Sequence, residues 1–254
     1  MEKWEVTVGY DNGDLRKLEL IRVNRDVEGY PIYVEKNIGN LSYQYLLQPL
    51  NTMLNEIYTI DKYIPAHVVL RGNPVLVSTH IGHHGNSKGH DGRPLVPIMW
   101  RVRKPKQINV WHFVHEATEI ELKLRGMRRP RWFIEGLSQY TAHTFFSMYH
   151  KEWLPYVWKH YNAYESIPIS ELFDWDYAGL SIRKSTNQGK LSDILQWATG
   201  WHSTPRERAL YGVALRVFVD RFMNNVEPME LRDIALNRPD GLAWVEAQLR
   251  NAHE

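Results

Sequence analysis

The 254-residue sequence predicts an α+β fold, with strands in its first part and helices in its second. Short β-branched and aromatic runs between turn residues mark residues 1–106, which also hold one helical pattern. From residue 107, apolar residues recur every three or four positions, the spacing of amphipathic helices. No repeat or low-complexity linker interrupts residues 1–254, so we predict a single domain with a strand-rich lobe (1–106) and a helical lobe (107–254).

The composition is that of a globular protein without a dominant charge. The net charge of +2 gives no global field that would favour nucleic acid, and we predict no nucleic-acid partner. The two basic runs, 101–106 and 125–131, are interpreted as solvated ends of elements. No segment approaches 18 uninterrupted apolar residues, so we expect no membrane segment in a soluble chain, either cytoplasmic or secreted and processed. The absence of cysteine excludes disulfides and cysteine-ligated zinc.

Five segments of the first lobe have the composition of strands: 4–10, 18–23, 30–36, 66–72 and 95–103. The first two flank DNGD, whose Asn-Gly pair tolerates positive φ and favours a hairpin turn. Between the third and fourth strands, leucines at helical spacing predict a helix over 40–60, which Pro49 should bend.

A histidine-rich segment, 78–94, separates the last two predicted strands. It is rich in Gly, Ser and Asn and carries His80, His83, His84 and His90. A flexible surface loop is the preferred interpretation. A second metal site or a substrate-facing rim are the alternatives.

Six helices are predicted in the second lobe: 107–124, 133–149, 151–162, 205–223, 228–237 and 240–252. The helix from 205 has a clear start signal, because Thr204 can cap it, Pro205 suits its first position and Glu207 completes a capping box.

The helix 107–124 has two faces. Its apolar stripe steps by three and four residues and should pack into the core: Val110, Phe113, Ala117, Ile120 and Leu124. The other arc carries two histidines and two glutamates: His112, His115, Glu116 and Glu119. A solvent-exposed polar face is the ordinary interpretation of such an arc.

Spacing favours a metal site on that arc. His115 and Glu119 are four residues apart, so both can bind one cation, while Glu116 lies one step round the helix and can hold a water. A third ligand can come from Glu135, because the short connection through 125–130 returns the next helix antiparallel beside the first. Alone, Glu135 would be read as an acidic residue favoured near a helix N-terminus.

Two motifs carry a specific resemblance. VHEATE (114–119) followed by RPRWFIEGLSQYTA (129–142) resembles the paired active-site helices of gluzincin metallopeptidases, and most of all the peptidase-MA-like zincin domains. ALYGVALRVFVDRF (209–222) resembles the later helix of the same family. The resemblance covers about 110–145 and 205–223. It implies a zincin-like fold, a zinc-dependent peptidase acting on a peptide or protein substrate, and metal ligands at His115, Glu119 and Glu135.

The resemblance also assigns catalytic roles and exposes a departure. It implies Glu116 as general base towards the metal-bound water and Tyr211 as hydrogen-bond donor to the oxyanion. The family pattern is HExxH, whereas this chain has HExxE, with Glu119 in place of histidine. A second carboxylate makes the site harder and shifts preference from zinc towards manganese, iron or magnesium. His112 is the alternative ligand. His202 is interpreted as a surface histidine, with a role as auxiliary donor as the alternative.

Two other functions remain open from the sequence. A zincin-like binding or scaffold protein that has lost the metal is the chief competitor, although three retained carboxylates would repel one another without a cation. A hydrolase acting on peptidoglycan or another non-protein substrate is the third. The oligomeric state and the compartment are not indicated by any motif.

Overall fold

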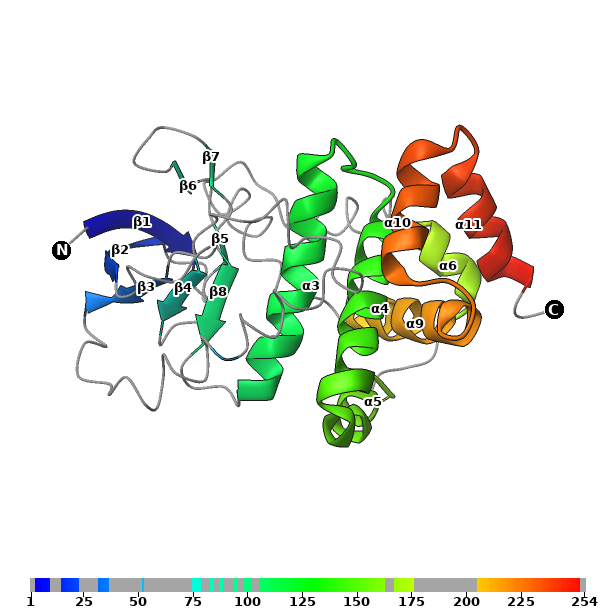
Figure 1. The fold of residues 1–254 in the computed structure, drawn as a ribbon, viewed down its shortest axis with the longest axis horizontal. Coiled ribbons are helices and arrows are strands. Elements are labelled where there is room, and N and C mark those ends of the chain that lie inside the picture. Colours follow the sequence, from blue (N-terminus) through cyan, green and yellow to red (C-terminus); the bar gives the residue numbers. More distant parts are fainter. Residues whose placement is uncertain are drawn as a thin grey trace. The chain divides into compact units, whose positions relative to one another are not determined.

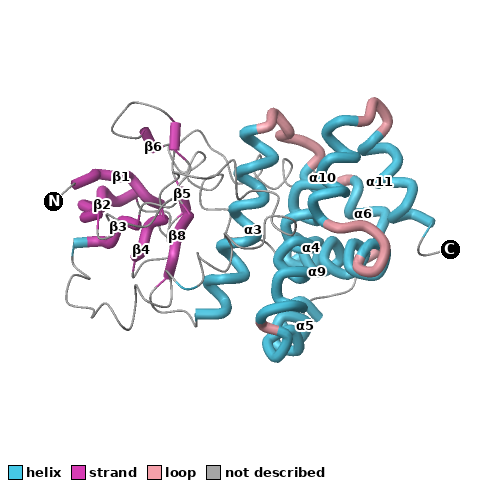
Figure 2. Tube along the Cα trace, in the orientation of Figure 1, coloured by secondary structure: helices cyan, strands magenta, loops and turns pink. Residues whose placement is uncertain are grey.

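The chain divides into two compact units, and within the part of the chain that the structure describes the division falls inside one helix, between Phe113 and Val114. The predicted boundary between the strand-rich and helical lobes is at residue 106. Along the chain, the described strands, magenta in Figure 2, all come before this helix, and the other main helices, cyan, come after it. The computed structural model describes residues 3–9, 15–22, 32–36, 52, 75–78, 83–84, 87–88, 94–95, 98–101, 106–162, 167–175 and 205–251.

The first unit contains a six-stranded mixed sheet in the order β5-β1-β2-β3-β4-β8 (Figure 1). Neighbours from β5 to β3 pair antiparallel, whereas β3, β4 and β8 pair parallel. A separate two-stranded sheet is formed by β6 and β7. The strands are β1 (Lys3–Gly9), β2 (Leu15–Arg22), β3 (Ile32–Glu35), β4 (Val75–Ser78), β5 (His83–His84), β6 (Ser87–Lys88), β7 (Pro94–Leu95) and β8 (Ile98–Arg101).

The register of the sheet agrees with the predicted hairpin. β1 and β2 pair antiparallel from Lys3 opposite Ile21 to Gly9 opposite Leu15, on either side of the DNGD segment. β3 is buried along its whole length, as expected for a strand inside a sheet. The predicted turn, the strand 66–72 and the helix 40–60, apart from residue 52, lie outside the described residues.

The prediction of a flexible loop over 78–94 is wrong for part of that segment. His83 and His84 form β5 against Gly9 and Val8 of β1, and β6 pairs with β7. Glycine and serine lowered the strand signal here, but a short strand at a sheet edge needs only a partner for its backbone groups. His80 and His90 lie outside the described residues.

The second unit is helical, and strands followed by helices make the described part of the chain α+β as predicted. Most helix bounds agree with the prediction within two residues, but 151–162 begins with a 3-10 turn and α6 was not predicted. The helices are α3 (Lys106–Leu124), α4 (Arg131–Tyr149), η2 (Lys151–Trp153), α5 (Leu154–Asn162), α6 (Ile169–Phe173), α9 (Pro205–Phe222), α10 (Pro228–Asn237) and α11 (Gly241–Arg250).

The end of α3 is a tight C-terminal turn. Gly126 has φ of 90°, a left-handed conformation that a side chain would disfavour. The Met127 amide donates to the Leu122 carbonyl at 2.9 Å, and the Gly126 amide donates to Lys123 at 3.1 Å. Met127 is itself buried, which anchors the turn. The chain therefore leaves α3 in a fixed direction and enters α4 after a connection of only six residues, 125–130.

The core of the second unit is built around α4. Every residue of this helix from Trp132 to Phe146 is buried, and it packs mainly against α9 and α10. Gly136 allows the close approach of α9, because a Cβ atom there would overlap the Phe218 ring. The close contact with α9 fixes α4 at the turn that carries Glu135.

Candidate metal centre

Helix α3 is buried along most of its apolar stripe and over part of its polar arc. The predicted apolar stripe lies in the core from Val110 to Ile120, but Leu124 is 55% exposed, because the helix ends there. The arc expected to be polar is also covered: His115 and Glu119 retain only 7% and 9% exposure. A solvated helix face is therefore ruled out for these two residues.

Three side chains bring one ligand atom each to a common point. His115 Nε2 lies 3.0 Å from Glu119 Oε1 and 3.3 Å from Glu135 Oε2. All three ligand atoms lie within 4.8 Å of one another. His115 and Glu119 come from successive turns of α3, and Glu135 comes from the second turn of α4. Among the described residues this is the only such group of histidine and acidic side chains.

The other carboxylate oxygens face cations. Lys123, one turn further along α3, donates to Glu119 Oε2 at 2.5 Å. Arg131, one turn before Glu135 on α4, donates through Nε to Glu135 Oε1 at 3.3 Å. Each carboxylate thus turns one oxygen towards His115 and the other towards a positive charge.

Tyr211 belongs to the same group. Its hydroxyl lies 3.3 Å from Glu135 Oε1 and accepts a hydrogen bond from Arg131 Nη2 at 3.1 Å. Its ring centroid is 6.5 Å from that of His115, and Trp175 packs edge-on against it at 4.9 Å. The third helix of the predicted site, α9, therefore places its tyrosine beside the proposed ligands.

The ionisation of the group follows from its charges. Burial lowers the pKa of His115, but hydrogen bonds and charges from Glu119 and Glu135 outweigh it and raise this pKa to about 10. Burial acts against ionisation of Glu119 too, yet Lys123 and His115 hold its pKa well below the usual range. The pKa of Glu135 is raised, by burial and by the negative charge of Glu119. Two carboxylates so close together favour a cation between them.

The geometry fits a divalent ion. Ligand atoms around a tetrahedral zinc lie about 3.3 Å apart, close to the two distances from His115 Nε2. Apart from its 3.3 Å contact with His115 Nε2, the buried Glu135 Oε2 has no hydrogen-bond partner among the described residues, and the buried His115 Nδ1 has none. An ion would satisfy the first of these atoms. It would not satisfy the second, which in metal-bound histidines usually donates to a neighbour.

The remaining predicted residues are placed as follows. Glu116 is half-buried beside His115, and its charge acts on Lys123. His112 is half-buried and is not part of the convergent group, which contains Glu119 instead. His202 lies outside the described residues.

Sequence reasoning missed Lys123 and Arg131. The run 125–131 was interpreted as a solvated end; this holds for Arg125, Arg128 and Arg129 but is wrong for Arg131, which is half-buried against Glu135. The signal was available, because Glu119–Lys123 and Arg131–Glu135 are both opposite charges four residues apart on a helix.

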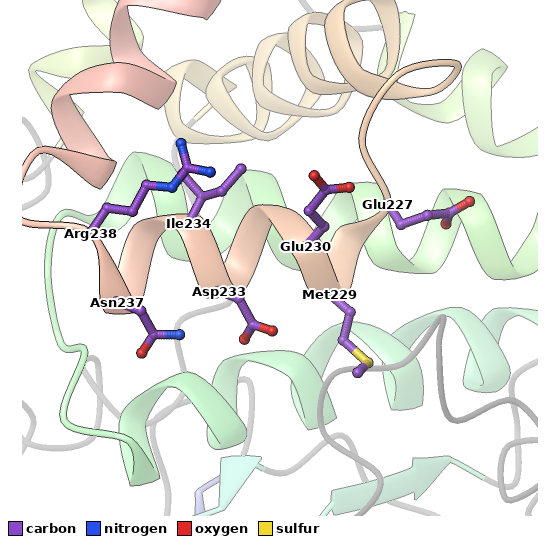
Figure 3. A pocket seen from close by; sticks show the side chains of 7 residues that line it. All are labelled: Glu227, Met229, Glu230, Asp233, Ile234, Asn237 and Arg238. Carbon is purple, nitrogen blue, oxygen red and sulfur yellow. The ribbon is translucent and has the colours of Figure 1, made fainter.

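The described residues also line an open hollow on another part of the second unit. It follows α10 and is lined by Glu227, Glu230, Asp233 and Arg238, among others. Figure 3 shows the Glu230 carboxylate above the helix and that of Asp233 below it, so these groups do not converge. We therefore place the candidate site at His115, Glu119 and Glu135.

No helix within the described ranges has the length and apolar character needed to cross a membrane. No family model matches the chain, and the searches of curated proteins and of solved structures found no match either.

Proposed function

We propose that this protein is a metal-dependent peptidase of the gluzincin type, with a zincin-like fold. The observation that carries the proposal is the convergence of three ligand atoms from two consecutive helices. Glu116, the candidate general base, directly follows the ligand His115 on α3. A divalent cation held by His115, Glu119 and Glu135 would supply Lewis-acid activation of water and of the scissile carbonyl.

The chain's own residues would perform the proton and charge steps. Glu116 accepts the proton of the attacking water and passes it to the leaving amine. Tyr211 donates a hydrogen bond to the developing oxyanion, a contribution worth about 3 kcal/mol of barrier in comparable sites. Arg131 donates to the Tyr211 hydroxyl, which in turn donates its proton to Glu135 Oε1 at 3.3 Å, so Tyr211 would exchange this acceptor for the oxyanion.

A second candidate is a zincin-like binding protein without catalysis. The ion pairs favour it, because Lys123, Arg131 and a protonated His115 balance the carboxylates without a metal. Mass spectrometry of the purified protein separates the two candidates by its metal content.

The test of catalysis is Glu116→Gln. We expect peptide-library cleavage to fall by about 10²-fold or more while the metal content stays at the wild-type value. Unchanged cleavage by the metal-loaded variant would remove Glu116 from the mechanism. Glu230→Gln on α10 is the matched control, because that carboxylate lines the separate hollow.

A further inference from the structure

Lys123 acts on the one ligand that departs from the family pattern. It donates to Glu119 Oε2 at 2.5 Å, whereas Glu119 Oε1 faces His115 Nε2 at 3.0 Å. The two oxygens of this carboxylate therefore have separate partners. Because Lys123 follows Glu119 by one helical turn, the pairing is built into α3.

The pairing decides how many ligand atoms Glu119 can offer. An ammonium group bonded to one carboxylate oxygen competes with an ion for that oxygen, so the carboxylate favours binding the ion through the other oxygen, whereas a free carboxylate can bind readily through both. Glu135 is held in the same way by Arg131 and Tyr211 on Oε1. The protein then supplies three ligand atoms in total, one from each side chain.

The number of ligands bears on the identity of the metal. Zinc sites of catalytic proteins have three protein ligands in a four-coordinate arrangement, while manganese and magnesium favour six oxygen-rich ligands. Lys123 also neutralises the negative charge of Glu119, so the two side chains together carry no net charge. Both effects counter the hardness that a second carboxylate gives to the site.

We propose that Lys123 is a positioning residue that sets metal selectivity, by holding Glu119 to one oxygen and so favouring zinc over manganese. This inference rests on the proposed function, because it requires that His115, Glu119 and Glu135 bind a metal.

The experiment is a competition titration of the metal-free full-length chain with Zn²⁺ and Mn²⁺. In Lys123→Met we expect the preference for zinc over manganese to fall by about tenfold or more. Lys123→Arg keeps a donor to Glu119 and should stay close to wild type. Lys159→Met removes an exposed lysine of α5 and should change nothing.

The outcomes separate the two proposals. If Lys123→Met weakens both metals equally or neither, the selectivity role is wrong while the metal site stands. If wild type binds neither metal, the metal site itself is wrong and this inference falls with it. The side chain of Lys123 is 45% exposed, so the variants should fold. X-ray absorption of zinc-loaded wild type adds a measurement without substitution: a zinc coordination number well above four would overturn the proposal.

Discussion

Helix α3 buries two carboxylates two residues apart, and their surroundings differ. Glu119 contributes one oxygen to a group of three ligand atoms, in which the other two come from His115 and Glu135. Glu121 is fully buried too, but one of its oxygens accepts from Arg125 and from Arg232 of α10, and no other ligand atom gathers there. Burial of a charge is therefore compatible with a structural role, whereas convergence of ligand atoms indicates a site.

Histidines show the same contrast. His115 and His143 are both buried, at 7% and 6% exposure. Carboxylates raise the pKa of His115 to about 10, while burial lowers that of His143 to about 4. His143 lies edge-on to Trp158 at 5.5 Å. An isolated buried histidine is kept neutral, whereas one between carboxylates is kept charged, and a metal would have to displace its proton in order to bind.

The largest effect on stability should come from loss of the buried ion pair between Glu121 and Arg232. Glu121→Ala would remove the buried partner of Arg232, itself 6% exposed, would leave it the half-exposed Asp233 at 2.6 Å as an ion-pair partner, and would open a cavity. We expect the free energy of unfolding to fall by about 3–5 kcal/mol in urea titrations. Metal affinity of the folded protein should be unchanged. Loss of metal binding at full stability would contradict the distinction between Glu119 and Glu121.

Acid should destabilise the protein through His143. Its pKa is about 4 when folded and near 6.5 when unfolded, so the unfolded chain binds its proton first as the pH falls. Neutral His143 therefore adds about 3 kcal/mol to the free energy of unfolding. This contribution is fully present above pH 6.5 and is lost as the pH falls from 6.5 to 4. Urea titrations at several pH values should show this loss in wild type and a flatter dependence in His143→Leu. Equal slopes would show that other groups govern the pH dependence.

A smaller effect should come from the helix contact behind the site. Gly136→Ala forces the Phe218 ring to move, at a cost of about 1–3 kcal/mol in unfolding free energy. Because Glu135 precedes Gly136, zinc affinity should weaken as well. The control is Gly136→Ala combined with Phe218→Leu, which makes room for the new methyl group. If the combination does not recover zinc affinity, the packing of α9 does not position Glu135.

Much of the helical unit could be predicted from local pattern. The periodicity of 107–124 and the short connection to the next helix were enough to expect Glu135 near His115 and Glu119. Leu124 shows where periodicity fails to predict burial. It continues the apolar spacing to the end of the helix, but the core does not extend that far and the side chain is exposed. α6 and the strands β4 to β7 were missed because they are short and depend on distant partners. The contact of Arg131 with Tyr211, 80 residues apart, is likewise invisible to helical spacing.

Calorimetric titration of the metal-free protein with zinc tests the account most directly. We predict saturable binding of one ion per chain, weakened by at least about 10²-fold in Glu135→Gln and unchanged in Glu121→Gln. Absence of saturable binding, or equal affinity in wild type and Glu135→Gln, would show that His115, Glu119 and Glu135 do not form a metal site.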